Sequence, residues 1–587
     1  PGVYHFSGYE FSFDRLCAAF RSDASGGDIW GHKKGRAAPR DHPSPRAEIG
    51  RDEGLSRVTA IGVPACTAHR SSPIKVNGIF LVSPNIPAGG SEPHHGDGPM
   101  SGAPRAHIAP NTPDFLTAPM IAPTGFREYD ARWRFPDQIN LPGVEALGLG
   151  LGHQVRESGR RDIVVGHDYR DYAGAVKTAL VLGLVRAGLT VHDIGVALSP
   201  MAYFARLHLG VEAVAMVTAS HNPNGWTGVK MGLAPPLTHG PEEMAELRDL
   251  ALGGRAGAAA GGRVIRQPGV AAAYLDDLAS DGPLARPLKV VCACGNGTAG
   301  LFAPPLLERL GVEVVPLHTA PDYTFPHYNP NPEALEMLHD MGAAVRAAGA
   351  DLALGFDGDG DRCGVVDGAG REIFADRLGV MLARDMARPG AHFVVDVKST
   401  GLFASDPELA ARGATVEYWK TGHSHMKARV AATGAVAGFE KSGHFFLPPH
   451  GFDCGLRAGV AVLRMLDRAG RSLAALEADL PRAFNMPTLS PACPDRAKYA
   501  VMDRIAVDLA GVAALGGSAV ARIVTVNGAR VELADGAWAL VRASSNTPNL
   551  VVVCESLTSA AHLRAVFADL DAIIRRQPEV GAYDQTF

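Results

Sequence analysis

The chain has no uninterrupted apolar stretch of about 18 or more residues, so we expect no membrane span. It also lacks the charged-then-apolar N-terminal segment that is typical of a secretory signal. Its eight cysteines are scattered and form no pair of CxxC motifs. A zinc site or a disulfide framework is therefore not expected, and we predict reduced thiols in the cytoplasm.

An excess of basic charge is absent as well. Lys and Arg number 56 against 61 Asp and Glu, which gives a net charge of −5. This balance does not favour a nucleic-acid partner, which is bound mainly through basic surfaces. The 587 residues, 46% of them apolar, are enough for several cores, and at roughly 100–200 residues per domain we expect about three to five domains.

The composition changes near residue 115. Residues 1–115 are rich in Gly, Pro, Ser, His and Arg, and we predict a disordered N-terminal extension because such a segment buries little apolar surface. Beyond it, apolar strands alternate with helical stretches, and this βαβ rhythm predicts parallel sheets covered by helices. The rhythm restarts twice and then gives way to hairpin signals. The predicted domains are 116–266, 267–375, 376–481 and a smaller α+β domain, 482–587.

An acidic loop, "DGDGDR", follows the apolar run "DLALGF". Asp357, Asp359 and Asp361 alternate there with glycines, and Arg362 follows. Burying three adjacent carboxylates requires a cation, and hard oxygen ligands suit Mg²⁺. A solvated acidic turn is the alternative reading. An EF-hand is disfavoured because no Glu stands at the twelfth position.

A polar loop, "TASHNPNG", follows the apolar run "VEAVAMV". Its Asn-Pro and Asn-Gly pairs predict a turn, so Ser220 and His221 are expected at a strand end, with Lys230 ten residues after the serine. A surface turn with a capping serine is the alternative. Serine is a poor nucleophile unless it is activated, but a phosphorylated serine beside a divalent metal is a phosphoryl donor.

Two further loops are polar. "EKSGH" offers Glu440, Ser442 and His444, and "WKTGHS" offers His423; a carboxylate, a hydroxyl and an imidazole can bind the vicinal hydroxyls of a sugar. "RASSNTP" combines one arginine with hydroxyl groups between two predicted strands, as in a phosphate cradle. Taken singly, each is better explained as an ordinary polar loop.

The motifs "TASHNP", "DGDGDR", "WKTGHS", "EKSGH" and "RASSNTP", in this order, closely resemble the α-D-phosphohexomutases, in particular their bacterial phosphomannomutase/phosphoglucomutase branch. The resemblance runs from about residue 126 to the C-terminal helix. It implies three tandem mixed α/β sheet domains plus a smaller C-terminal α+β domain around a central active-site cleft.

The resemblance also implies roles for individual residues. Ser220 would be the phosphoserine and would bind Mg²⁺ together with the three aspartates. Lys230 and His444 would act as general acid and base, and Arg362 and His221 would complete the catalytic set. The implied substrate-binding residues are Tyr129, Arg132, Lys398, His423, Glu440, Ser442, Arg542, Ser544, Ser545, Asn546 and Thr547. The phosphate loop has one serine more than the commoner family form, so either Ser545 or Asn546 takes the role of the family's asparagine. Lys441 stands where the family often marks its substrate.

The implied reaction interconverts hexose 6-phosphate and hexose 1-phosphate, of mannose and/or glucose, through a phosphoserine and a hexose 1,6-bisphosphate. The expected partner is a small phosphosugar, and the expected state is a monomer or weak dimer. Phosphoglucosamine mutase is an alternative, although its phosphate loop, "RPSGTEP", is absent here. A metal phosphatase and a non-catalytic binding protein that keeps the fold are the others.

Overall fold

The computed structural model describes residues 103–545 and 547–587, which fall within one compact unit. Most of the predicted N-terminal extension, and Asn546, lie outside the described residues. Residues 103–115 are described, however, and they are more structured than predicted. Helix α2 (Pro113–Thr117) begins there under a Thr112 cap, and Arg105 bridges to Met120.

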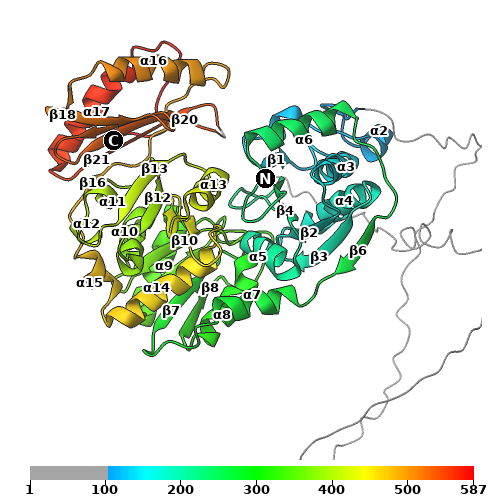
Figure 1. The fold of residues 1–587 in the computed structure, drawn as a ribbon, viewed down its shortest axis with the longest axis horizontal. Helices are drawn as coiled ribbons and strands as arrows, with labels where there is room; N and C mark the ends of the chain where they lie inside the picture. Colours follow the sequence, from blue (N-terminus) through cyan, green and yellow to red (C-terminus); the bar gives the residue numbers. More distant parts are fainter. Residues whose placement is uncertain (1–102, 546) are drawn as a thin grey trace, which may run out of the picture. The chain divides into compact units, whose positions relative to one another are not determined.

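The first sheet has six strands in the order β1-β5-β4-β2-β3-β6 (Figure 1). Its centre is parallel, as the βαβ rhythm predicts, but β5 runs antiparallel to both of its neighbours. The elements of this region are η1 (Pro123–Gly125), β1 (Ala131–Arg134), α3 (Leu141–Glu157), β2 (Asp162–His167), α4 (Ala173–Arg186), β3 (Thr190–Val196), α5 (Ser199–Leu209), β4 (Ala213–Val217), β5 (Trp226–Gly232), α6 (Pro241–Gly253) and β6 (Arg263–Arg266).

The second and third sheets repeat this plan, with parallel strands from one edge to the middle and antiparallel pairing at the other edge. The second has the order β11-β10-β9-β7-β8 and the third β13-β12-β14-β15. The second region comprises α7 (Val270–Leu278), β7 (Lys289–Ala293), η2 (Thr298–Leu301), α8 (Ala303–Arg309), β8 (Glu313–Leu317), α9 (Leu335–Ala348), β9 (Leu352–Phe356), β10 (Cys363–Asp367) and β11 (Glu372–Ile373). The third comprises α10 (Ala375–Met386), β12 (His392–Asp396), α11 (Leu402–Ser405), α12 (Pro407–Ala411), β13 (Thr415–Trp419), α13 (His423–Thr433), β14 (Ala437–Phe439), β15 (Phe445–Phe446), α14 (Gly455–Ala469) and α15 (Leu473–Glu477).

The fourth sheet is antiparallel throughout, in the order β16-β21-β20-β19-β18-β17. This confirms the predicted α+β character of the last region. Its elements are β16 (Phe484–Asn485), α16 (Lys498–Ala510), β17 (Ala514–Leu515), β18 (Ser518–Val524), β19 (Ala529–Leu533), β20 (Trp538–Ala543), β21 (Leu550–Ser556) and α17 (Ala560–Ile574).

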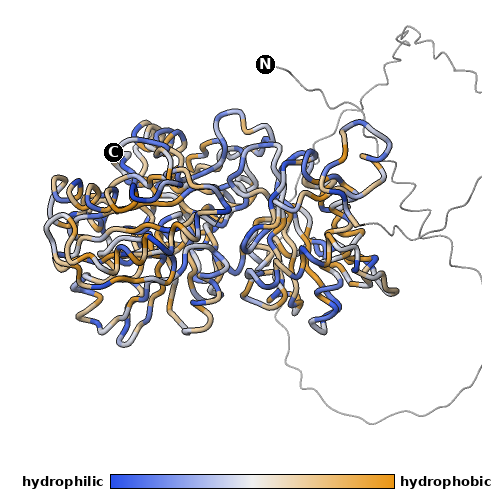
Figure 2. The backbone as a smooth tube through the Cα atoms, turned by 90° about the horizontal axis from the view of Figure 1, so that it is seen from above, coloured by the Kyte–Doolittle hydropathy of each residue, from blue (hydrophilic) through white to orange (hydrophobic). Residues whose placement is uncertain are grey.

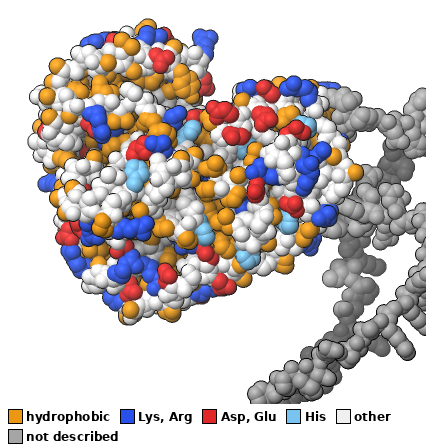
Figure 3. All heavy atoms as spheres, in the orientation of Figure 1, with side chains coloured by type: hydrophobic (Ala, Val, Ile, Leu, Met, Phe, Trp, Pro, Cys, Tyr) orange, Lys and Arg blue, Asp and Glu red, His pale blue; other side chains and the backbone are white. Residues whose placement is uncertain are grey.

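Buried apolar side chains form separate cores within the described residues. One core lies on one face of the first sheet and another belongs to the fourth sheet. The largest core is shared by α5, the other face of the first sheet, the second and third sheets and part of the fourth. Hydrophobic and hydrophilic stretches alternate along the chain as it passes through these sheets (Figure 2). On the face seen in Figure 3, basic and acidic side chains are interspersed. Across the described range, no helix combines the length and apolar character that crossing a membrane requires.

Candidate active site

Ser220 lies in the loop between β4 and β5, and its φ of 52° is in the left-handed region. Residues other than glycine rarely adopt this conformation. Buried contacts hold it: Arg170 Nη2 donates to the Ser220 carbonyl oxygen at 2.8 Å, and Asp168 accepts from the N–H of Ala219 at 3.2 Å. Asp168 and Arg170 also pair with each other, at 3.2 Å. The loop is therefore fixed by an ion pair that lies beneath it.

The acidic loop between β9 and β10 meets this serine. Ser220 Oγ lies 3.0 Å from Asp357 Oδ2. Gly358 permits the approach, because a Cβ at that position would stand only 2.5 Å from the Ser220 carbonyl oxygen. Gly360 has a φ of +71°, which favours glycine. Both glycines therefore allow the acidic loop to curl tightly against the serine.

The three aspartates are completely buried, and one carboxylate oxygen of each lies within 4.8 Å of the others. Burial and the two neighbouring carboxylates raise the pKa of Asp357 well above its usual value. Lys230 Nζ lies 2.7 Å from Asp359 Oδ2 and also contacts Asp361. Asp359 Oδ1 is buried and has no hydrogen-bond partner among the described residues, and Asp361 Oδ1 has only the imidazole of His444 nearby, at 3.5 Å. Convergent, partly unpartnered carboxylate oxygens fit a hard divalent cation, so the cluster is a candidate metal centre.

His444 lies beside the metal candidates. Its Nε2 is 3.5 Å from Asp361 Oδ1, and its Nδ1 is 2.9 Å from Ser442 Oγ and 3.2 Å from Glu440 Oε2. Although burial opposes the shift, Asp361 and Glu440 together raise the pKa of His444 to about 9. Arg362 reaches the same imidazole, with Nε at 3.4 Å.

His221 adjoins the serine, with its Nδ1 at 3.3 Å from Ser220 Oγ. The charge of Arg362 and burial lower the pKa of His221 well below its usual value. The structure therefore brings the expected catalytic set together around the serine.

Other expected residues surround this centre. The Tyr129 ring packs edge-on against His423, with centroids 4.9 Å apart. Arg132 is held by Asp130 at 2.8 Å, and its buried Nη1 has no hydrogen-bond partner among the described residues. Lys398 Nζ lies 4.0 Å from Asp396.

The "RASSNTP" loop follows β20. Ser544 Oγ and Thr547 Oγ1 are 2.7 Å apart, and the buried Arg542 donates to the Ala543 carbonyl oxygen at 2.9 Å. Burial lowers the pKa of Arg542, while nearby Asp396 and Tyr129 oppose the shift. Hydrogen bonds from His425 and Ser545 hold the pKa of Glu128 below its usual value. These interactions link the "RASSNTP" loop, which follows β20, to Glu128 and Tyr129, which precede strand β1.

Comparisons with known proteins identify the family of the chain. Four family profiles match in order, described as phosphoglucomutase/phosphomannomutase alpha/beta/alpha domains I, II and III and C-terminal domain, over residues 123–255, 272–370, 374–484 and 492–573. The chain belongs to the phosphoglucomutase/phosphomannomutase family. As a member it is a phosphohexomutase, an isomerase that moves phosphate within a hexose phosphate.

The similarity to individual relatives covers nearly the whole length of each relative. The chain is 34% identical to a phosphomannomutase/phosphoglucomutase of Pseudomonas putida over 464 residues, which are 78% of this chain and 96% of the relative. It is 33% identical to a phosphoglucomutase of Neisseria gonorrhoeae over 461 residues, 78% and 97% of the two chains. A solved family structure from Burkholderia thailandensis superimposes with a TM-score of 0.72 at 33% identity, covering 79% of this chain and 99% of that one.

In this phosphohexomutase several site residues have no motif signal of their own. Arg170 and Asp168 hold the serine loop, Lys427 and Asp453 form a buried pair behind the aspartates, and Glu128 contacts His425 at 2.8 Å. Gly166 and His167 still belong to β2, and nothing in the sequence indicates that Arg170, beyond the end of this strand, turns inward. These residues could have been found only from their burial.

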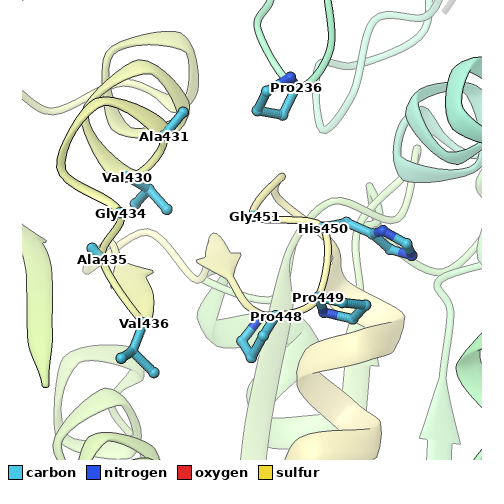
Figure 4. Close-up of a pocket in the computed structure, with 10 residues that line it drawn as sticks. All are labelled: Pro236, Val430, Ala431, Gly434, Ala435, Val436, Pro448, Pro449, His450 and Gly451. Carbon is cyan, nitrogen blue, oxygen red and sulfur yellow. The ribbon is translucent and has the colours of Figure 1, made fainter.

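Lys441, which the resemblance places where the family often marks its substrate, forms an ion pair within the third region. Its Nζ pairs with Asp376 at 3.2 Å, away from His444 and the three aspartates. A separate cavity of about 190 Å³ is lined by Pro236, the C-terminal part of α13 with the residues after it, and the 448–451 turn. Figure 4 shows these lining residues. The cavity contains none of the expected site residues, so the candidate site is defined by the side-chain cluster and not by this cavity.

Proposed function

We propose that this phosphohexomutase interconverts the 6-phosphates and 1-phosphates of mannose and glucose, with Ser220 as the carrier of the phosphoryl group. The observation that carries the proposal is the 3.0 Å approach of Ser220 Oγ to Asp357, in a buried centre with two further carboxylates. The two sugars are supported by the names of the Pseudomonas and Neisseria relatives.

Asp357, Asp359 and Asp361 would hold Mg²⁺, beside the phosphoryl oxygens of Ser220. When bound, this ion would neutralise the negative charge of the carboxylates and of the transferring group. The unpartnered Oδ1 of Asp359 supports this assignment. Ser199, whose Oγ donates to Asp359 at 2.5 Å, orients one ligand.

The first half-reaction breaks the bond between Ser220 Oγ and phosphorus and forms a bond from phosphorus to the free hydroxyl of a hexose 6-phosphate. The hydroxyl proton must leave as this bond forms, and the serine oxygen must regain a proton. Lys230 and His444 are the protonatable groups that contact the carboxylates, and we assign the two transfers to them. The second half-reaction returns the other phosphate of the 1,6-bisphosphate to Ser220.

Two loops would hold the sugar. Glu440 and Ser442, on the turn between β14 and β15, would bind hydroxyls. Arg542, Ser544, Ser545, Asn546 and Thr547 would bind the phosphate that is not reacting, because a guanidinium and a row of hydroxyls match its oxygens. Tyr129, Arg132, Lys398 and His423 would line the remaining surface.

A coupled mutase assay with Mg²⁺ and a trace of hexose 1,6-bisphosphate tests the proposal. We expect comparable kcat/KM for mannose 1-phosphate and glucose 1-phosphate, and a lower value for glucosamine 1-phosphate. Ser220→Ala should lower activity by about a thousandfold or more, whereas Ser405→Ala, at an exposed position of α11, should not change it. Full activity of Ser220→Ala would refute the phosphoserine. Dominant turnover of glucosamine 1-phosphate would refute the assignment of mannose and glucose as substrates. Release of inorganic phosphate without isomerisation would indicate a phosphatase.

A further inference from the structure

A buried ion pair lies behind the three aspartates. Lys427, in α13, and Asp453, which precedes α14, are completely buried, with Nζ 2.7 Å from Oδ1. The ammonium also lies over the ring of Tyr203, 4.3 Å from its centroid. Burial lowers the pKa of Lys427, whereas the Asp453 carboxylate and the aromatic face both favour its protonated amine. No motif in the sequence singles out these residues.

The second contact of this ammonium is His423. Lys427 Nζ lies 3.2 Å from His423 Nδ1, one helical turn away in α13. His423 Nδ1 also lies 3.4 Å from Ser424 Oγ and 3.9 Å from Asp453 Oδ2, so the ammonium is its nearest neighbour. An ammonium group has three donors and no acceptor, so Nδ1 accepts in this hydrogen bond. Burial and the charge of Lys427 lower the pKa of His423 well below its usual value, so the ring is neutral. A neutral ring that accepts at Nδ1 carries its proton on Nε2.

The Nε2 end of His423 faces a different environment. Nε2 is buried and has no hydrogen-bond partner among the described residues. Buried donors are rarely left unpaired, so a donor without a protein partner indicates a position that a ligand completes. The His423 ring lies between Tyr129, at 4.9 Å, and His444, at 6.1 Å between centroids. The unpaired N–H therefore belongs to the active site.

We propose that Lys427 is a positioning residue, which holds His423 as the Nε2–H tautomer so that this imidazole donates a hydrogen bond to an acceptor oxygen of the bound phosphosugar. The substrate half of this inference rests on the proposed function; the tautomer half does not. The fixed tautomer makes His423 a donor toward phosphate or hydroxyl oxygens and excludes it as a proton acceptor.

The tautomer is measured first, in the unmodified full-length protein. Two-bond ¹H–¹⁵N correlation spectra of protein labelled in its histidine rings distinguish the two neutral forms, and comparison with His423→Gln assigns the signal. We expect the proton on Nε2. A proton on Nδ1 would overturn the proposal, whatever the activity of any variant.

The effect on catalysis is measured by substitution. Removing Lys427 alone would leave Asp453 buried without its partner, so the variant is the pair Lys427→Met with Asp453→Asn. We expect it to lower kcat/KM about tenfold, the order lost with one hydrogen bond of this kind, and to show both His423 tautomers in the spectrum.

His423→Gln provides the matched background, because its amide N–H₂ lies near the position of Nε2 and does not depend on a tautomer. In that background the Lys427/Asp453 pair of substitutions should change kcat/KM less than about twofold. An equal tenfold loss in both backgrounds would mean that Lys427 is merely structural and would overturn the inference. A protein with the Nε2–H tautomer but no mutase activity would instead refute the proposed function.

Discussion

Gly358→Ala is expected to impair catalysis by separating two loops. The added Cβ would stand 2.5 Å from the Ser220 carbonyl oxygen, whereas ordinary contact begins at about 3.4 Å. One loop must therefore move by about 0.9 Å. A misplacement of about 1 Å between reacting groups can cost on the order of a hundredfold in rate. We expect a loss of about a hundredfold in kcat, together with weaker Mg²⁺ binding, because Asp357 moves with the loop.

The assay compares kcat, KM and Mg²⁺ affinity, by calorimetry, for Gly358→Ala and for Gly257→Ala. Gly257 is the matched control, because a Cβ there meets nothing within 4 Å. Thermal unfolding of both variants checks that the fold is retained. Unchanged kcat and Mg²⁺ affinity in Gly358→Ala would refute the reasoning that the close approach of Ser220 and the acidic loop sets the rate.

Three further outcomes are expected. Arg170→Met leaves the carboxylate of Asp168 buried without its partner and should lower the free energy of unfolding in urea by about 3–5 kcal/mol, whereas Arg471→Met, in an exposed pair with Asp479, should cost less than about 1 kcal/mol. Mg²⁺ at a hundred times its Kd should raise the free energy of unfolding by about 2.7 kcal/mol, and Asp359→Asn should abolish this increment. Burial lowers the pKa of His239 from 6.5 to about 4. Below pH 6.5 the unfolded chain therefore binds a proton that the folded protein does not, and the free energy of unfolding falls. Between pH 7 and 4.5 the loss should be about 2–3 kcal/mol, present in His339→Gln, at an exposed position, and absent in His239→Gln.

The parallel strands could be predicted from sequence because their apolar runs are continuous. The run at 211–217 predicted β4, which the structure places at Ala213–Val217. The strand begins later because the N–H of Val211 still donates a hydrogen bond to the Arg206 carbonyl oxygen at the end of α5. The antiparallel edges were harder to predict. Strand β5 contains glycines and Lys230, and a polar residue there is explained only by the carboxylates that it faces.

The candidate site likewise contains residues that the sequence could predict and residues that it could not. Ser220 and the three aspartates belong to contiguous motifs whose composition is unusual by itself. Lys427 and Arg170 are single charged residues, and in a sequence such residues indicate a solvated surface. Their burial results from partners far along the chain, such as Tyr203 for Lys427, and this pairing exists only once the domains have packed.

The backbone at Ser220 shows why the serine depends on more than one domain. A left-handed conformation costs a residue with a side chain about 1–3 kcal/mol, and surrounding contacts must hold it. Arg170, which follows β2, supplies one set of hydrogen bonds from the first sheet. Asn329 donates to the His221 carbonyl oxygen, and Gly358 packs on the Ser220 carbonyl, both from the second region. The loop conformation that presents the serine to the acidic cluster is therefore completed only where the first two domains meet. Substitutions on either side of that boundary should impair phosphoryl transfer before they impair the binding of sugar.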